Sequence, residues 1–156
     1  MPKQQILELE TVIQAIIRSD DTLYATFELL TSVPGFGLIT AASVLAETDG
    51  FAVVETGKQI SAHAGIAPSP FQSGTSVHGR GRISKMGNAH LRRSAYLAAL
   101  SATRNKGHLG DFYRRLRANG KPPKVALIAL GHKLLRTGLA VVRSGKPFSE
   151  TYLKPT

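Results

Sequence analysis

The sequence predicts an all-α domain, and three observations support this fold class. Apolar residues recur at spacings of three and four through most of the chain, which is the spacing of amphipathic helices. The one stretch with strand character, residues 51–54, is too short to build a sheet alone. The length of 156 residues and the hydrophobic content of 42% suffice for a single buried core.

The first expected helix has a coiled-coil-like pattern. Ile6, Leu9, Ile13 and Ile16 place a narrow apolar seam on a helix over residues 3–19. An isolated helix with such a seam is marginal in water and favours a partner helix. We therefore expect a homo-oligomer formed through this N-terminal helix. Packing of the seam against its own domain is the alternative.

The same spacing predicts six further helices. The second is capped by Asp20 or Asp21 and ends before Pro34. The others span residues 37–47, 58–63, 88–105, 109–119 and 123–143. The last opens on a proline pair, which suits a first helical turn. Its expected core residues are Val125, Leu127, Ile128, Leu130, Leu134, Leu135 and Leu139.

Cysteine is absent, which excludes disulfides, thiol nucleophiles and cysteine zinc sites. The N-terminus is polar and then amphipathic, unlike the apolar centre of a signal peptide. Uninterrupted apolar runs are only a few residues long. We therefore expect a cytoplasmic protein with no membrane partner.

The charge is distributed very unevenly along the chain. Residues 1–56 contain two basic and eight acidic residues, a formal charge of −6, whereas residues 57–156 contain eighteen basic and two acidic residues, a charge of +16. A stretch this basic repels itself unless it meets a polyanion. Nucleic acid is the expected partner, and a merely soluble basic surface is the alternative.

Residues 30–41 have the pattern of a helix-hairpin-helix element. Val33-Pro34-Gly35-Phe36-Gly37 joins two expected helices, and Gly35 and Gly37 permit a tight turn with positive φ. The free N–H groups at the start of the next helix can bind a phosphate oxygen. An ordinary turn with a glycine cap is the alternative, and the acidic surroundings favour it.

Residues 65–87 form an expected long loop rich in glycine, hydroxyl and basic side chains. Arg80, Arg82 and Lys85 can neutralise phosphate charge while the glycines let the backbone approach a ligand closely. No P-loop pattern is present. These residues indicate a phosphate or phosphodiester site in which one serine could be a nucleophile. A solvated linker is the alternative.

Several spaced motifs together resemble one known family. They are Val33-Pro34-Gly35-Phe36-Gly37, Ala64-Gly65-Ile66-Ala67-Pro68, Ser73-Gly74-Thr75-Ser76-Val77-His78-Gly79, Ile83-Ser84-Lys85-Met86-Gly87-Asn88 and Leu91-Arg92-Arg93. In this order they resemble the C-terminal domain of IS110-type bacterial transposases, the group that includes pilin-gene invertases and RNA-guided bridge recombinases. The resemblance covers roughly residues 29–148.

The resemblance implies a DNA recombinase whose serine attacks a phosphodiester and forms a covalent phosphoserine with DNA. The position that matches the family's serine is Ser73, with Ser76 and Ser84 as the alternatives. A serine hydroxyl needs a base and nearby cations for this reaction. His78 is either that base or a hydrogen-bond donor to phosphate. The expected phosphate-binding residues are Gly35, Gly37, Arg80, Arg82, Lys85, Asn88, Arg92 and Arg93. Further candidates for phosphate contact on the later helices are Arg104, Arg114, Arg115, Lys124, Lys133 and Arg136, of which some are expected to be solvated or paired with acids.

Full members of this family begin with a RuvC-like domain whose carboxylates bind magnesium. The acidic residues near the start of this chain have the spacing of a solvated helix face, so we expect no metal site or cofactor here and a truncated product or isolated domain. Magnesium is expected in the missing RuvC-like domain. The expected division is residues 1–28 as the end of a coiled coil, 29–149 as the DNA-binding and recombination domain, and 150–156 as a tail.

Two function classes follow. One is the serine-bearing part of a transposase, with DNA as its partner and a guide RNA as an additional partner that the resemblance admits. The other is a DNA- or RNA-binding module that keeps the fold without catalysis and regulates a full-length transposase. Ser73 is compatible with both.

Overall fold

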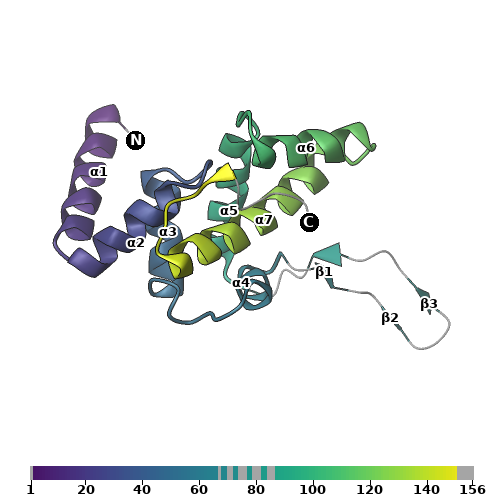
Figure 1. Cartoon of the computed structure of the whole chain (residues 1–156), viewed down its shortest axis with the longest axis horizontal. Helices are drawn as coiled ribbons and strands as arrows, with labels where there is room; N and C mark the ends of the chain where they lie inside the picture. Colours follow the sequence, from purple (N-terminus) through teal and green to yellow (C-terminus); the bar gives the residue numbers. More distant parts are fainter. Residues whose placement is uncertain are drawn as a thin grey trace.

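The computed structural model describes residues 2–66, 68–69, 72–73, 77–78, 82–83 and 87–150, and it confirms the all-α fold class (Figure 1). The helices of these residues are α1 (Lys3–Arg18), α2 (Asp21–Thr31), α3 (Leu38–Thr48), α4 (Gly57–Ala64), α5 (Ala89–Ala102), α6 (His108–Ala118) and α7 (Pro123–Ser144). Four two-residue strands lie between α4 and α5: β1 (Pro68–Ser69), β2 (Gln72–Ser73), β3 (Val77–His78) and β4 (Arg82–Ile83). The residues expected as an irregular loop therefore include short paired strands.

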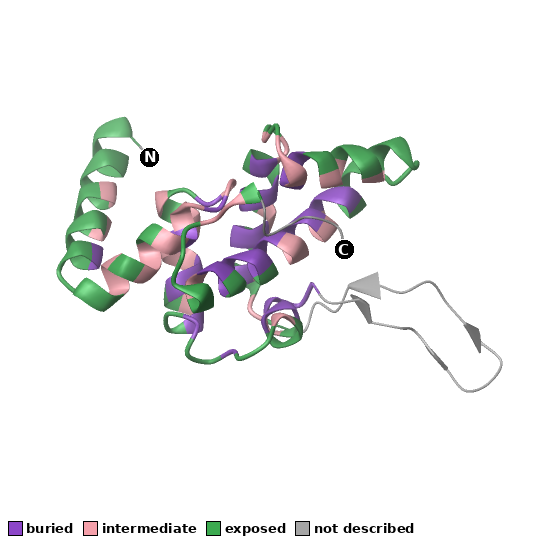
Figure 2. Ribbon diagram, in the orientation of Figure 1, coloured by how far each residue is buried: buried purple, intermediate pink, exposed green. Residues whose placement is uncertain are grey.

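Helix α7 lies at the centre of the fold and contacts α2, α4, α5 and α6. Leu130, Leu134 and Leu135 on α7 are fully buried. Figure 2 shows buried residues along much of this helix. Within the described part of the chain, α7 alone is long and apolar enough to cross a membrane, and 56% of its most apolar window is buried inside the domain. This burial is typical of a core helix.

The prediction that Val125 belongs to the core is wrong, because its side chain is 50% exposed. Val125 lies in the first turn of α7, next to the exposed turn that follows α6, and α7 becomes buried only from Ala126 onward. The strand candidate at residues 51–54 is a turn in which Phe51 has a φ of 71°. Asp20, one of the two expected caps, accepts a hydrogen bond from the Leu23 N–H at 3.0 Å.

Small residues bring α5 and α7 close together. Ala95, Ala98 and Ala99 on α5 are almost fully buried. A Cβ atom built on Gly131 of α7 would lie 3.2 Å from the Ala95 carbonyl oxygen of α5. Gly138 gives α7 a similar close contact with α2, since a Cβ atom there would lie 2.7 Å from a methyl group of Leu30. Larger side chains at these positions would separate the helices, so the core depends on residues with little or no side chain.

The turn between α2 and α3 packs against α5. Gly35 has a φ of 105°, and a Cβ atom there would lie 2.6 Å from the Ala98 carbonyl oxygen. Gly37 has a φ of −99°, so the expectation of positive φ is right for Gly35 and wrong for Gly37. Gly37 instead caps α3 in an extended conformation, and its N–H donates to the Thr40 hydroxyl at 2.9 Å.

Helix α1 contacts α2 and α3. Near its C-terminal end, Ile13, Ile16 and Ile17 line an apolar groove with α2 and α3 residues. Toward its N-terminus, Ile6 and Leu9 are 42% and 51% exposed. Of the residues that line the groove, Ile17 is buried and Ile13 is half-buried, whereas Ile16 is 59% exposed. The helix therefore packs on its own domain only in part, and most of the seam faces solvent.

Gly35→Ala is expected to lower the free energy of unfolding by about 2–4 kcal/mol, because it adds a backbone clash to the strain of positive φ. Gly120 is the matched control, since its φ is 89° and a Cβ atom there meets nothing within 4 Å. Gly120→Ala should therefore cost only the strain, about 1–2 kcal/mol. Urea unfolding measures both values. Equal losses would contradict the packing of Gly35 on α5.

Candidate nucleic-acid interface

The chain leaves the helical body after α4 and returns to it before α5 through two adjacent backbone segments. We call residues 65–66 and 87–88 the neck. The Asn88 N–H donates to the His63 carbonyl oxygen at 2.7 Å, and the Ile66 N–H donates to the Ser61 carbonyl oxygen at 3.1 Å. A Cβ atom on Gly87 would lie 2.7 Å from the Gly65 nitrogen, so the two segments approach too closely for another residue at 87. The neck is thus fixed by backbone contacts.

Asn88 holds the return segment to both α5 and α3. Its Oδ1 accepts a hydrogen bond from the Leu91 N–H at 2.9 Å, which caps α5. Its Nδ2 donates to the Glu47 carboxylate. Asn88 was expected to bind phosphate, but both ends of its amide are engaged within the fold, so a structural role accounts for this residue.

Three basic side chains gather beside the neck. Arg92, Arg93 and Lys124 line a cavity of about 270 Å³ between α5 and α7, together with Ile66 of the neck. The Arg92 guanidinium also donates to the Ala64 carbonyl oxygen at 3.4 Å. The cavity has an apolar wall formed by Ala89, Ala95, Tyr96, Leu127, Ile128 and Gly131. This arrangement can attract an anion to the base of the segment between α4 and α5.

The strands between α4 and α5 form two antiparallel pairs. β1 pairs with β4, with Ser69 opposite Arg82, and β2 pairs with β3, with Ser73 opposite Val77 (Figure 1). The backbone therefore places Ser73 and Arg82 in different strand pairs. The other expected site residues of this segment, Ser76, Ser84, Arg80 and Lys85, lie outside the described residues.

The expected hairpin and the neck contact different parts of α5. Gly35 packs against Ala98, whereas the neck meets α5 at Asn88. Ten residues of helix separate these points, about 15 Å at a rise of 1.5 Å per residue. The described contacts therefore bring Asn88, Arg92 and Arg93 together and leave Gly35 and Gly37 apart from them. Phosphate binding by the two glycines stays a prediction.

Some basic residues are occupied within the fold. Arg114 pairs with Asp111 at 2.7 Å and also donates to backbone carbonyls of the α5–α6 connection. Arg143 donates to the Val54 carbonyl oxygen at 2.6 Å. Lys124, one of the further candidates for phosphate contact, lies beside Arg93 because α7 packs along α5. Only this contact between distant segments identifies Lys124 as a neighbour of the neck.

Comparisons with known proteins place these residues in a family. The model of the IS116/IS110/IS902 transposase family matches residues 27–114. The chain is 29% identical over 146 residues to the pilin gene-inverting protein of Moraxella bovis, covering 93% of this chain and 45% of that protein. It is 31% identical over 142 residues to the insertion element IS110 uncharacterized 43.6 kDa protein of Streptomyces coelicolor, covering 91% of this chain and 34% of that protein. The chain therefore spans less than half the length of these relatives.

Asn88→Ala is expected to lower the free energy of unfolding by about 2 kcal/mol, because it removes the cap of α5 and the hydrogen bond to Glu47. Asn88→Ser keeps a capping hydroxyl and loses only the bond to Glu47, so its cost should be about 1 kcal/mol. Chemical denaturation of both variants tests this order. Unchanged stability in both would indicate an amide that is free to contact a ligand.

Proposed function

The chain belongs to the IS116/IS110/IS902 transposase family, and from this premise we propose that it binds DNA and takes part in transposition or site-specific recombination. The family match over residues 27–114 carries the proposal, because it includes the neck, the segment between α4 and α5, and all of α5. The cations beside the neck support it physically, since they can hold the DNA backbone next to that segment. The bacterial cytoplasm is the expected place of action.

DNA binding in this proposal depends on phosphate contacts. Residues 57–156 carry a formal charge of +16. Arg93 and Lys124 are exposed at the neck cavity. Contacts of this kind position a duplex without reading its sequence. Sequence choice must then come from elsewhere in the assembly, for which a guide RNA is one candidate partner.

We propose Ser73 as the nucleophile of the recombination step, on the resemblance of its surrounding motif to the family's serine. Its Oγ would form a bond to phosphorus while the bond between phosphorus and the bridging oxygen of the departing strand breaks. The hydroxyl proton would pass to a base, and the departing oxygen would take up a proton to leave as a hydroxyl. The product is a phosphoserine diester between protein and DNA.

Basic side chains in the segment between α4 and α5 would stabilise the charge that develops on phosphorus oxygens during this step. Arg80, Arg82 and Lys85 are the candidates. His78 on β3 is the candidate base, and Ser76 and Ser84 remain the alternative nucleophiles. The roles of all these residues are assigned from the resemblance of the sequence motif to the family.

Magnesium is not assigned to these residues. In the described part of the chain, no group of three His, Asp or Glu residues is placed to hold a metal ion. Magnesium binding is expected of the RuvC-like domain of full family members, whereas the serine step above uses side chains of this chain.

We also propose a homo-oligomer formed through α1, because Ile6, Leu9 and Val12 are between 42% and 54% exposed along that helix.

Binding to duplex DNA should weaken steeply with salt. If about six Lys or Arg residues reach phosphates, the log–log slope of affinity against salt is roughly −5. Fluorescence anisotropy titrations at several salt concentrations measure it. Arg93→Gln with Lys124→Gln should make the slope shallower by about 2. A flat salt dependence of the unmodified chain would contradict the DNA-binding proposal.

Ser73→Ala should leave DNA affinity nearly unchanged and abolish the covalent protein–DNA adduct, because one hydroxyl adds little to binding by many charges. The assay combines the chain with a separately expressed RuvC-like domain of the family and element-end DNA, and denaturing gels detect the adduct. Ser76→Ala and Ser84→Ala are the matched controls and should retain it. An adduct that persists in Ser73→Ala would move the nucleophile elsewhere. No adduct with the unmodified chain, beside an active intact family member, would favour the non-catalytic binding module.

A further inference from the structure

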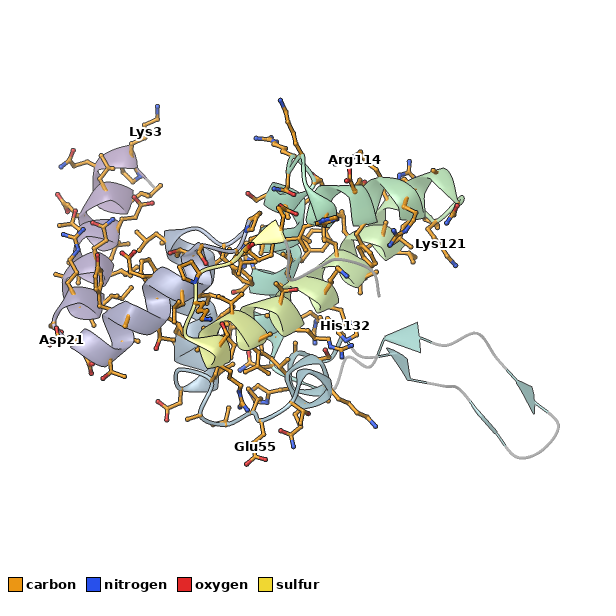
Figure 3. The ribbon with its side chains drawn as sticks, viewed as in Figure 1. Lys3, Asp21, Glu55, Arg114, Lys121 and His132 are labelled. Atoms are coloured by element: carbon orange, nitrogen blue, oxygen red, sulfur yellow. The ribbon has the colours of Figure 1, made fainter. Side chains whose placement is uncertain are left out.

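A second group of basic side chains surrounds a cavity between α6 and α7. The cavity has a volume of about 510 Å³ and is lined by Phe112 from α6 and by His132, Lys133, Arg136 and other residues from α7. The neck cavity uses Lys124, Leu127, Ile128 and Gly131 of the same helix. Each residue of an α-helix turns by about 100°, so the residues of α7 that line the two cavities point to opposite sides of the helix. Figure 3 shows the His132 side chain on this helix.

The aromatic ring of Phe112 positions the cations of this second cavity. The Lys133 ammonium lies 4.8 Å from the ring centroid, and the Arg115 guanidinium lies 5.7 Å from it. Both distances are within the range of cation–π contacts, which hold a charged side chain against a ring without neutralising it. Arg136 is held from another side, since its side chain packs against Gly57 at the start of α4.

No carboxylate in the described part of the chain forms an ion pair with these cations. Every Asp and Glu lies within the described residues, and the two ion pairs found there join Asp111 to Arg114 and Glu150 to His108. Burial lowers the pKa of Lys133, and the charges of Arg115 and Arg136 lower it further. Burial and then Arg136 lower the pKa of His132 in the same way. Like charges are thus crowded together in a cavity that an anion would stabilise.

We propose that this cavity, lined by Lys133 and Arg136 beside Phe112, is a second phosphate-binding site for the DNA strand, separate from the neck. The inference rests on the proposed DNA-binding function. Lys133 and Arg136 would each contact a backbone phosphate, and the alanine and valine side chains of the cavity wall would pack against the sugar. Because the two cavities lie on opposite sides of α7, this site would contact phosphates other than those held beside the neck.

The test compares two charge-matched double variants in duplex DNA titrations. Lys133→Gln with Arg136→Gln removes the two cations of the cavity. Lys106→Gln with Lys121→Gln removes one exposed cation from each of the connections before and after α6 and serves as the control. The cavity variant should reduce the log–log salt slope from roughly −5 to roughly −3, since each lost phosphate contact removes about 0.9. The control should stay near the slope of the unmodified chain.

A second measurement uses inorganic pyrophosphate and does not depend on DNA. Pyrophosphate should raise the melting temperature of the unmodified chain and of the control variant, and should raise it much less in the cavity variant. The melting temperature of the cavity variant without ligand shows whether this variant folds. If the double variant does not fold, Arg136→Gln alone gives a second test, because it changes only an exposed residue.

The outcomes separate the two proposals. Equal salt slopes and equal pyrophosphate responses in the cavity and control variants would overturn the second site while DNA binding by the neck stands. Absence of DNA binding by the unmodified chain would overturn the proposed function, and the assignment of this site to DNA with it. Loss of binding to single-stranded RNA but not to DNA in the cavity variant would also overturn that assignment.

Discussion

The close contact between α5 and α7 is the constraint on which the rest of the structure depends. Ala95 on α5 faces Gly131 on α7, and Ala98 on the same helix receives Gly35 from the α2–α3 turn. Because none of these residues carries a large side chain, the backbones themselves approach closely. The turn, the two helices and the neck that begins α5 are therefore fixed relative to one another. Both basic cavities are lined by α7, and the neck cavity lies directly between α7 and α5.

The sequence predicted the helices well because their apolar spacing is regular. It predicted less about the turn between α2 and α3. Gly35 and Gly37 look equivalent in the motif, yet one has positive φ against α5 and the other caps α3. The difference arises from the Ala98 carbonyl oxygen, a contact between residues 63 positions apart that periodicity does not report. Val125 was wrongly assigned to the core for a related reason. The apolar spacing of α7 already includes Val125, but nothing in the described part of the chain covers the first turn of this helix.

The sequence predicted which basic residues could form the candidate site, but it predicted less about which of them lie together. Arg92 and Arg93 were expected to contact phosphate and do lie at the neck cavity. Lys124 joins them only because α7 runs beside α5. Asn88 has the residue type of a phosphate ligand, but its amide is engaged by Glu47, an acidic residue 41 positions earlier. A single sequence shows which side chains could bind an anion, whereas tertiary contacts decide which of them are already occupied.

The neck allows the segment between α4 and α5 to change in evolution independently of the helical body. Gly65 and Gly87 lie against each other at the point where the segment leaves and re-enters the helical body. The backbone contacts of the neck therefore hold the two ends of the segment together. The entropy cost of a closed segment grows only slowly with its length, about 0.6 kcal/mol for each doubling. Residues 67–86 could therefore be exchanged for a segment of different length or chemistry at little cost to the core. One helical scaffold can in this way carry divergent reactive segments.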